Sequence, residues 1–208
     1  IASELGRGLS KKYKIHFIAY KKPVRLNYLN KNIFYHKVDV PMYPLFEYPP
    51  YELALATTIV EVVEKHNLDL IHVHYAIPHA YAGYMAKQML KDNGYNIPII
   101  TTLHGTDITL VGNHPFYKPA VTFSINNSDI VTCVSKSLKD DTIDFFNIKR
   151  EIKVIPNFID IKKYNEKHES CENNVISKGD EKIIIHISNF RPLKRVNDVL
   201  KVFKKINK

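Results

Sequence analysis

Short apolar segments alternate along this chain with longer amphipathic ones, and this alternation restricts the folds that the chain can adopt. The apolar segments are rich in β-branched and aromatic residues and lie at 14–20, 32–38, 69–74, 97–103, 129–134, 151–155 and 182–188. The helix-like stretches lie at 51–66, 77–93, 116–127 and 136–146. Strands that do not alternate polar and apolar residues are typical of parallel sheets buried on both faces. The pattern predicts an α/β, Rossmann-like, doubly wound domain.

Both ends of the chain indicate an incomplete version of this fold. Ile1, Leu5 and Leu9 have helical spacing, so we expect the chain to open on a helix, with the first strand of the sheet missing. The strand expected at 182–188 and the helix after it form a single βα unit, which cannot bury its own faces. We therefore expect an N-terminal domain over 1–160, a linker or excursion over 161–181, and the start of a second domain over 182–208.

Composition indicates a globular cytoplasmic protein. Apolar residues make up 45% of the chain, enough for a sizeable core, and no run reaches the roughly 18 apolar residues of a membrane span. The opening IASELGRGLSKK lacks the apolar core of a signal peptide. Cys133 and Cys171 are too few for a disulfide framework. The net charge of +9 comes from scattered lysines, which does not favour nucleic-acid binding.

Polar residues at the carboxyl ends of the expected strands are the main candidates for function, because ligands of parallel sheets bind at that edge. His72 and His74 share one side of a strand, but no third ligand is placed by sequence, so a metal site is not favoured. Tyr75 follows directly. Its hydroxyl either touches a ligand or packs under the next helix, and the sequence leaves both open.

The stretch TTLHGTD, residues 101–107, follows the apolar run IPII. His104 comes just after the strand and is expected to face the crevice, while Gly105 permits a positive φ or a close backbone approach. Asp107 is more simply explained as a cap of the following segment. Capping is also the favoured role of Ser135 or Ser137 at the start of the helix over 136–146.

Four polar residues gather where the expected strand at 182–188 gives way to a helix. Asn189, Arg191, Lys194 and Arg195 offer cations next to a helix start, which suits a diphosphate. The alternative is a solvated basic helix start. No GxGxxG or GxxxxGK[ST] sequence occurs, which argues against a dinucleotide fingerprint or a Walker loop in these residues.

Several strings together resemble one enzyme family. FEYPPYELALA, LIHVHYAIPHAYAGYMAKQM, TTLHGTDITLVG, VTCVSKSL, VIPNFID and HISNFRPLKRV are similar to the family 4 retaining glycosyltransferases, in particular to their malate-using branch in bacillithiol biosynthesis. The resemblance covers nearly all 208 residues. It implies the two-domain GT-B fold, a cytoplasmic enzyme without a cofactor or catalytic metal, and transfer of N-acetylglucosamine from UDP-GlcNAc to L-malate with retention.

The resemblance also implies roles for individual residues of the N-terminal domain. His104 matches the histidine near the transferred sugar. Tyr75 and Thr102, or its neighbour Thr101, fall where the acceptor malate is held. Asn157, at the crossing between the domains, is implied to help shape the acceptor pocket.

In the C-terminal part, Lys194 matches the lysine that binds the donor diphosphate, with Arg191 or Arg195 beside it. Many relatives carry Arg five residues before that lysine, whereas this chain has Asn189. Relatives also have a glycine-rich loop before the opening helix and paired glutamates in a C-terminal segment, neither of which is present. We therefore expect the chain as given to be inactive or nearly so.

Three alternatives stay open at this point. One is a family 4 glycosyltransferase with a different acceptor. Another is a non-catalytic nucleotide- or anion-binding module, and the third is a sugar-nucleotide epimerase of similar architecture. The sequence leaves the oligomeric state open, a homo-oligomer included.

Overall fold

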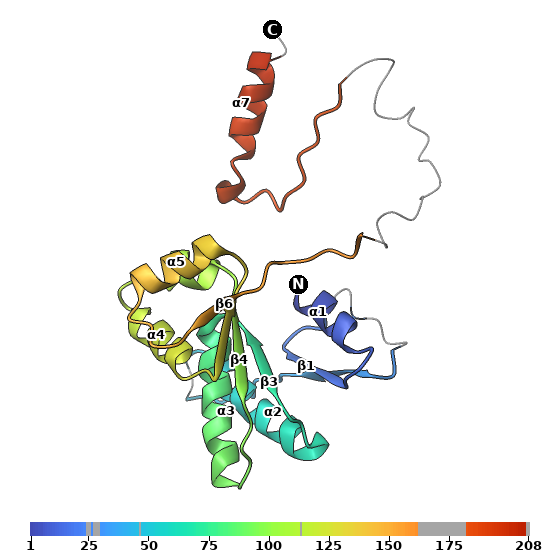
Figure 1. Cartoon of the computed structure of the whole chain (residues 1–208), viewed down its shortest axis with the longest axis vertical. Helices are drawn as coiled ribbons and strands as arrows, with labels where there is room; N and C mark the ends of the chain where they lie inside the picture. The colour runs from blue at the N-terminus through green and yellow to red at the C-terminus, as the bar shows by residue number, and fades with distance from the viewer. Residues whose placement is uncertain (24–25, 27–29, 46, 113, 162–181, 207–208) are drawn as a thin grey trace. The chain divides into compact units, whose positions relative to one another are not determined.

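The computed structural model describes the chain except for residues 24–25, 27–29, 46, 113, 162–181 and 207–208 (Figure 1). It divides into two units, Ile1–Phe158 and Ile159–Lys208. All but the first residue of the expected linker, 161–181, lies outside the described residues. None of the described helices has the length and apolar character that crossing a bilayer requires.

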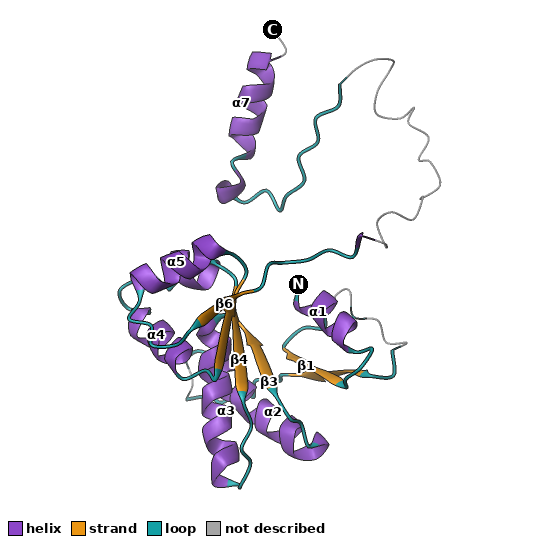
Figure 2. Ribbon diagram, in the orientation of Figure 1, coloured by secondary structure: helices purple, strands orange, loops and turns teal. Residues whose placement is uncertain are grey.

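The strands of unit 1 form two parallel sheets, shown in orange in Figure 2. β1 (Ile15–Ala19) pairs with β2 (Ile33–Lys37). The second sheet has the order β3 (Ile71–His74), β4 (Ile99–Leu103), β5 (Ile130–Cys133) and β6 (Ile152–Val154). The strand predictions between residues 14 and 155 are confirmed. Because all pairs in this sheet are parallel, the carboxyl ends of its strands meet at one edge.

Helices connect these strands where the periodicity predicts them. They are α1 (Ala2–Leu9), α2 (Tyr51–His66), α3 (Tyr81–Asp92), α4 (Lys118–Asn126) and α5 (Lys136–Phe145). Single turns η1 (Ala76–Ala80) and η2 (Thr106–Leu110) follow β3 and β4. At the start of α5 the Oγ of Ser135 accepts a hydrogen bond from the backbone N–H of Leu138 at 3.1 Å. The capping role expected of Ser135 is therefore confirmed.

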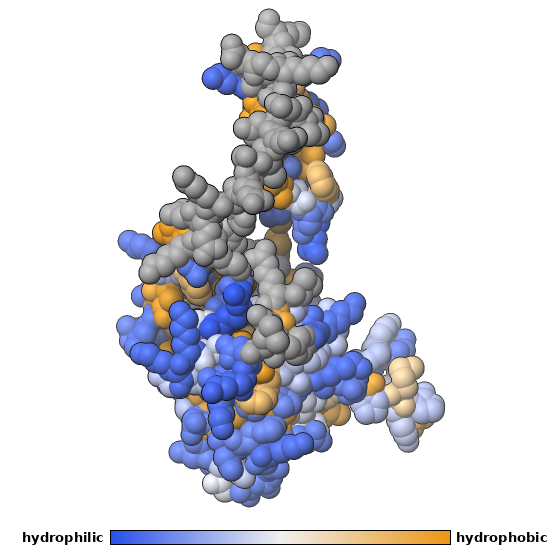
Figure 3. Space-filling view, turned by 90° about the vertical axis from the view of Figure 1, so that its right-hand side faces the viewer, coloured by the Kyte–Doolittle hydropathy of each residue, from blue (hydrophilic) through white to orange (hydrophobic). Residues whose placement is uncertain are grey.

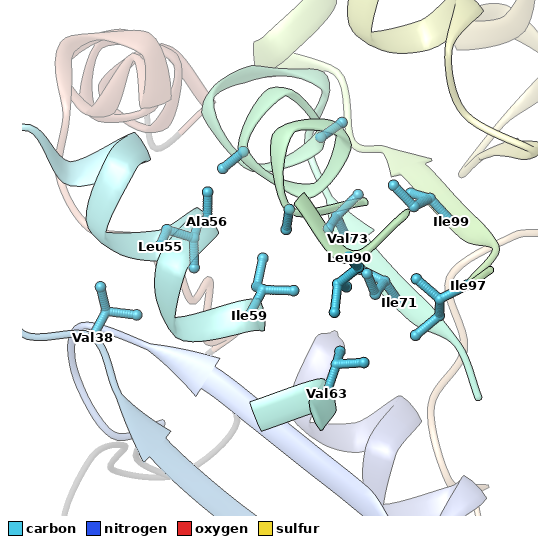
Figure 4. Close-up of a cluster of buried hydrophobic side chains, with 13 residues drawn as sticks. Val38, Leu55, Ala56, Ile59, Val63, Ile71, Val73, Leu90, Ile97 and Ile99 are labelled. Atoms are coloured by element: carbon cyan, nitrogen blue, oxygen red, sulfur yellow. The ribbon is translucent and has the colours of Figure 1, made fainter. Parts of the chain in front are cut away.

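The larger core cluster lies where α2 and α3 cover one face of β3 and β4 (Figure 4). Leu55, Ile59 and Val63 of α2 recur at intervals of four, so they share the buried face of that helix. At Gly83 of α3 a Cβ would lie 3.2 Å from Val73, so glycine allows a close approach of helix and sheet. A second cluster joins α4 and α5 to β4, β5 and β6.

The opposite face of the second sheet is more open than the doubly wound pattern predicts. His72 is exposed there, and His74 and Thr102 are half-buried. The register aligns His74 with Thr102, Thr102 with Thr132, and Thr132 with Lys153, so these side chains form a row across four strands. Among the described helices, α2, α3 and α4 bury the other face of this sheet.

In unit 2 the predicted strand over 182–188 is wrong. Its backbone is irregular, and its isoleucines are exposed, Ile187 by 90%. A strand forms only when a neighbour supplies hydrogen-bond partners, and no described segment pairs with this one. The unit continues with a short turn, η4 (Pro192–Lys194), and α7 (Val196–Ile206). Figure 3 shows apolar side chains at the surface of this unit, in orange.

Candidate active site

The imidazole of His104 lies against His74, the last residue of β3, and against Tyr75, which follows it. Its Nε2 is 2.8 Å from Nδ1 of His74, so one of these nitrogens donates a hydrogen bond to the other. The ring centroid of Tyr75 is 4.9 Å away. His104 is half-buried and so stays within reach of a ligand at this edge of the sheet.

Burial keeps these histidines uncharged. It lowers the pKa of His74 to about 3, with His72 and His104 adding smaller effects of the same sign. Burial also lowers the pKa of His104, against an opposing effect of the Asp107 carboxylate. Near neutral pH the pair therefore acts as hydrogen-bonding groups without positive charge.

Asp107 holds the ends of β3 and β4 together. Its Oδ2 accepts a hydrogen bond from the backbone N–H of Ala76 at 2.9 Å, and its Oδ1 accepts from those of His104 and Gly105 at 3.2 and 3.0 Å. The side chain is only 3% exposed. Gly105 has a φ of +113°, a conformation that glycine adopts without strain. Asp107 thus positions the loop that carries His104, instead of facing a ligand.

Tyr75 occupies a backbone conformation that residues other than glycine rarely adopt. Its φ is +79°. Its N–H donates to the carbonyl of Thr102 at 2.9 Å, and its own carbonyl accepts from Ala80 at 3.2 Å. The side chain is 38% exposed, so it is not packed away under the next helix. Strain of this kind clusters at functional sites in proteins.

The two adjacent threonines of β4, Thr101 and Thr102, point to opposite faces of the sheet. Thr102 is half-buried on the open face, where its Oγ1 lies 2.8 Å from both Nε2 of His72 and Oγ1 of Thr132. Thr101 is wholly buried, and its hydroxyl bonds to that of Ser128 at 2.7 Å. The expectation that Thr101 could hold the acceptor is therefore corrected, because alternation along the strand turns its side chain into the core.

Asn157 lies after β6 in an exposed, irregular segment near the end of unit 1. Within the described part of the chain, it makes no hydrogen bond to His104, Thr102 or Tyr75. The structure does not bring it into the cluster around His104, and its proposed place at the acceptor pocket stays a prediction.

Sequence reasoning missed His79 in η1. Its Nδ1 is buried and has no hydrogen-bond partner among the described residues. The ring centroid is 6.1 Å from that of Tyr75 and 6.3 Å from that of Tyr51. A buried, unpaired nitrogen is costly unless a ligand or water satisfies it. The sequence shows a histidine five residues after His74, in HYAIPHA, but this spacing does not by itself indicate a binding site.

The four residues predicted to bind the donor lie together in unit 2, all exposed. Arg191 directly precedes the turn η4, Lys194 is its last residue, and Asn189 lies before both. Arg195 donates from Nε to Oδ2 of Asp198 at 2.6 Å. No acidic side chain in the described ranges pairs with Arg191 or Lys194. Residues 182–208 contain eight Lys and Arg against one Asp, so +7 of the net charge of +9 falls in this segment. This corrects the interpretation that the net charge comes from lysines scattered along the chain.

Comparison with known families decides the family of the chain. The model of Glycosyltransferase Family 4 matches residues 1–163, which include all of unit 1. This chain belongs to glycosyltransferase family 4.

Within this family the chain is similar to two curated relatives. It is 46% identical over 208 residues, 99% of its length, to the N-acetyl-alpha-D-glucosaminyl L-malate synthase of Bacillus anthracis. It is 28% identical over 197 residues, 95% of its length, to an uncharacterized glycosyltransferase of Methanocaldococcus jannaschii. These matches cover 54% and 50% of the two relatives, so the chain spans about half the length of each.

A solved structure supports the fold of this family 4 chain. The sucrose-phosphate synthase of Thermosynechococcus elongatus superposes with a TM-score of 0.51, covering 77% of this chain and 86% of the other. At 16% identity this likeness concerns the fold alone. It agrees with the GT-B architecture expected from the sequence.

Replacing Asp107 by asparagine should destabilise the family 4 domain. One carboxylate oxygen would become an NH₂ group that faces backbone N–H donors, which leaves buried donors unsatisfied. We expect the free energy of unfolding to fall by about 1–3 kcal/mol. Urea denaturation of Asp107→Asn measures this, with Asp144→Asn on the exposed side of α5 as the matched control. Equal stability of the two variants would contradict the role given to Asp107.

Stability should also fall as the pH falls from 7 to 5. The folded-state pKa of His74 is about 3, below the ordinary value of 6.5, so the unfolded chain binds a proton that the folded chain does not. This contribution is complete above pH 6.5 and is lost progressively towards pH 3. His16, with a pKa of about 4, acts in the same direction.

We expect His74 alone to contribute a loss on the order of 1–2 kcal/mol between pH 7 and pH 5, measured by urea denaturation at each pH. His74→Asn should show a shallower dependence, because asparagine keeps a hydrogen-bonding group near the Nδ1 position but does not titrate. His114→Asn, at an exposed histidine, is the control and should keep the full slope. A slope unchanged in His74→Asn would show that His74 is not the titrating group.

Proposed function

We propose that this family 4 chain forms the acceptor-binding part, and the beginning of the donor-binding part, of a cytoplasmic retaining glycosyltransferase. The proposed reaction transfers N-acetylglucosamine from UDP-GlcNAc to the hydroxyl of L-malate. The observation that carries the proposal is the 46% identity, along 99% of the chain, to a relative whose name states that activity.

The groups around His104 suit the handling of hydroxyl groups. His74, His104, Thr102 and Tyr75 are neutral groups that can donate or accept hydrogen bonds at one sheet edge. In the proposal His104 orients the transferred sugar, and Tyr75 and Thr102 contact the acceptor. His104 is not assigned the role of a lone general base.

The stereochemical outcome proposed is retention through displacement on one face of the sugar. A double displacement needs a carboxylate nucleophile beside the anomeric carbon. The carboxylate nearest to His104 in sequence, Asp107, is buried and already accepts three backbone hydrogen bonds. It is therefore a poor nucleophile, which favours the same-face route.

Charge on the departing UDP would be stabilised from unit 2. Arg191, just before the turn η4, and Lys194, its last residue, are exposed cations. A diphosphate leaving group gains negative charge as the glycosidic bond breaks. Arg195 is a weaker candidate because its guanidinium already pairs with Asp198. In this proposal side-chain cations provide the electrostatic stabilisation, and no catalytic metal or other cofactor is assigned.

The proposal predicts that UDP release depends on malate. The full-length protein that carries this chain should release UDP from UDP-GlcNAc only when L-malate is added, measured by a coupled assay for UDP and by mass spectrometry of the product. Release with another hydroxy acid and not with malate would assign a different acceptor. Conversion of UDP-GlcNAc into an epimer would indicate the epimerase alternative. Saturable binding of UDP-GlcNAc without turnover would indicate a non-catalytic module.

Replacing His104 by alanine in that full-length protein should lower kcat by roughly 10²–10³-fold, the usual cost of losing one preorganised hydrogen-bonding group at a reacting centre. KM for UDP-GlcNAc should change much less, because the donor diphosphate is assigned to unit 2. His114→Ala removes an exposed histidine elsewhere in unit 1 and is the matched control. If both variants turn over at the same rate, His104 has no part in the reaction.

A further inference from the structure

Three histidines from separate elements of unit 1 converge away from the candidate active site. They are His16 in β1, His36 in β2 and His66, the last residue of α2. One ring nitrogen of each can be chosen so that all three lie within 4.8 Å of one another. Nδ1 of His16 is 2.8 Å from Nε2 of His36, and the ring of His66 lies 4.6 Å from that of His16, centroid to centroid.

The fold brings these side chains together for a simple reason. The register pairs His16 with Phe34 and Ile18 with His36, so His16 and His36 project from one face of the parallel pair. The C-terminal end of α2 covers that face and adds His66. Phe34 stacks on His16 with centroids 4.6 Å apart, which fixes the plane of that ring.

We propose that His16, His36 and His66 form a binding site for a divalent transition metal that prefers imidazole ligands, Zn²⁺ foremost. Three histidines with a water molecule in the fourth position are an established donor set for this ion. Zn–N bonds of about 2.0–2.1 Å in a tetrahedron place the nitrogens about 3.3 Å apart. The nitrogens of His16 and His36, which are 2.8 Å apart, need to separate by about half an ångström, whereas His66 needs to approach by up to about 1.5 Å. His66 is an exposed side chain at a helix end that can move to do it.

The protonation of the cluster suits a metal. Burial lowers the pKa of His16 to about 4 and also lowers that of His36, so both rings are neutral near pH 7 and a metal has no proton to displace from a charged ring. The proton now shared between Nδ1 of His16 and Nε2 of His36 would move to the outer nitrogen of its own ring. Both inner nitrogens would then offer a lone pair, with no net release of protons.

The surrounding charges have opposing effects on the binding of a cation. His66 ends a helix of 16 residues, whose C-terminus carries a partial negative charge that favours a cation. Lys14 and Lys65 lie close enough to lower the pKa of His16 and His36, respectively, and they would weaken metal binding. The imidazole donors must therefore provide most of the affinity, which favours Zn²⁺ over Mg²⁺ or Ca²⁺ because the latter require oxygen ligands.

The site is separate from the proposed chemistry. Tyr51 begins α2 and contacts His79 beside Tyr75, whereas His66 ends the same helix, roughly 22 Å further along at 1.5 Å per residue. A metal at His66 would connect α2 to the sheet formed by β1 and β2. Its role would be structural, and its test does not depend on glycosyl transfer.

The test uses the complete chain without an affinity tag, stripped with EDTA and titrated with ZnCl₂ by calorimetry. One Zn²⁺ per chain should bind. His66→Ala should weaken binding by roughly 10–100-fold or more, since loss of a ligand costs at least as much as loss of an outer partner of a ligand. His114→Ala is the matched control and should bind as the unaltered chain does. Co²⁺ in place of Zn²⁺ should give the visible absorption of a tetrahedral ion, absent in His66→Ala.

A thermal melt adds a second measurement. Zn²⁺ in excess of its dissociation constant should raise the Tm of the unaltered chain and of His114→Ala, because a ligand that binds only the folded state stabilises it. It should leave the Tm of His66→Ala unchanged. Because His66 is exposed, the metal-free variant should melt as the unaltered chain does. Absence of stoichiometric binding, or equal binding by His66→Ala, would overturn the proposal.

Discussion

One buried carboxylate, that of Asp107, links the loops after β3 and β4, because it accepts backbone hydrogen bonds from residues that follow each strand. A buried carboxylate is costly unless its oxygens are satisfied, so the loops after the two strands are held where their N–H groups can reach it. These hydrogen bonds fix the backbone positions of Tyr75 and His104. The distance of 4.9 Å between their rings follows from this arrangement and needs no direct hydrogen bond between the two side chains.

Local pattern predicted most of unit 1 but could not decide which side chains lie on the open face of the sheet. The run IPIITTL is apolar enough to be buried on both faces, so nothing in it shows whether Thr101 or Thr102 turns outward. Register with His74 and Thr132 settles this in favour of Thr102. The turn at Asp107 was predictable from its local partners, whereas its bond to Ala76, 31 residues earlier, depends on the pairing of β3 with β4.

Features that depend on distant parts of the chain were not predictable. The segment 182–188 has strand-like composition, yet a strand also needs a neighbour, and no described segment provides one. His16, His36 and His66 are 20 and 30 residues apart and follow no metal-binding spacing. Their meeting requires the parallel register of β1 with β2 and the length of α2. Composition and periodicity carry the local information and leave the pairing of distant elements undetermined.

Neutral histidines in unit 1 and clustered cations in unit 2 imply a division of tasks within the proposed enzyme. Burial lowers the pKa of both His74 and His104, so neither can balance negative charge near pH 7. The proposal therefore assigns the diphosphate of the donor to unit 2, where residues 182–208 hold most of the net positive charge. If malate is the acceptor, as proposed, its carboxylates raise the same requirement on the acceptor side. The uncharged histidines there do not meet it, and His104 and Thr102 remain suited to hydroxyl groups.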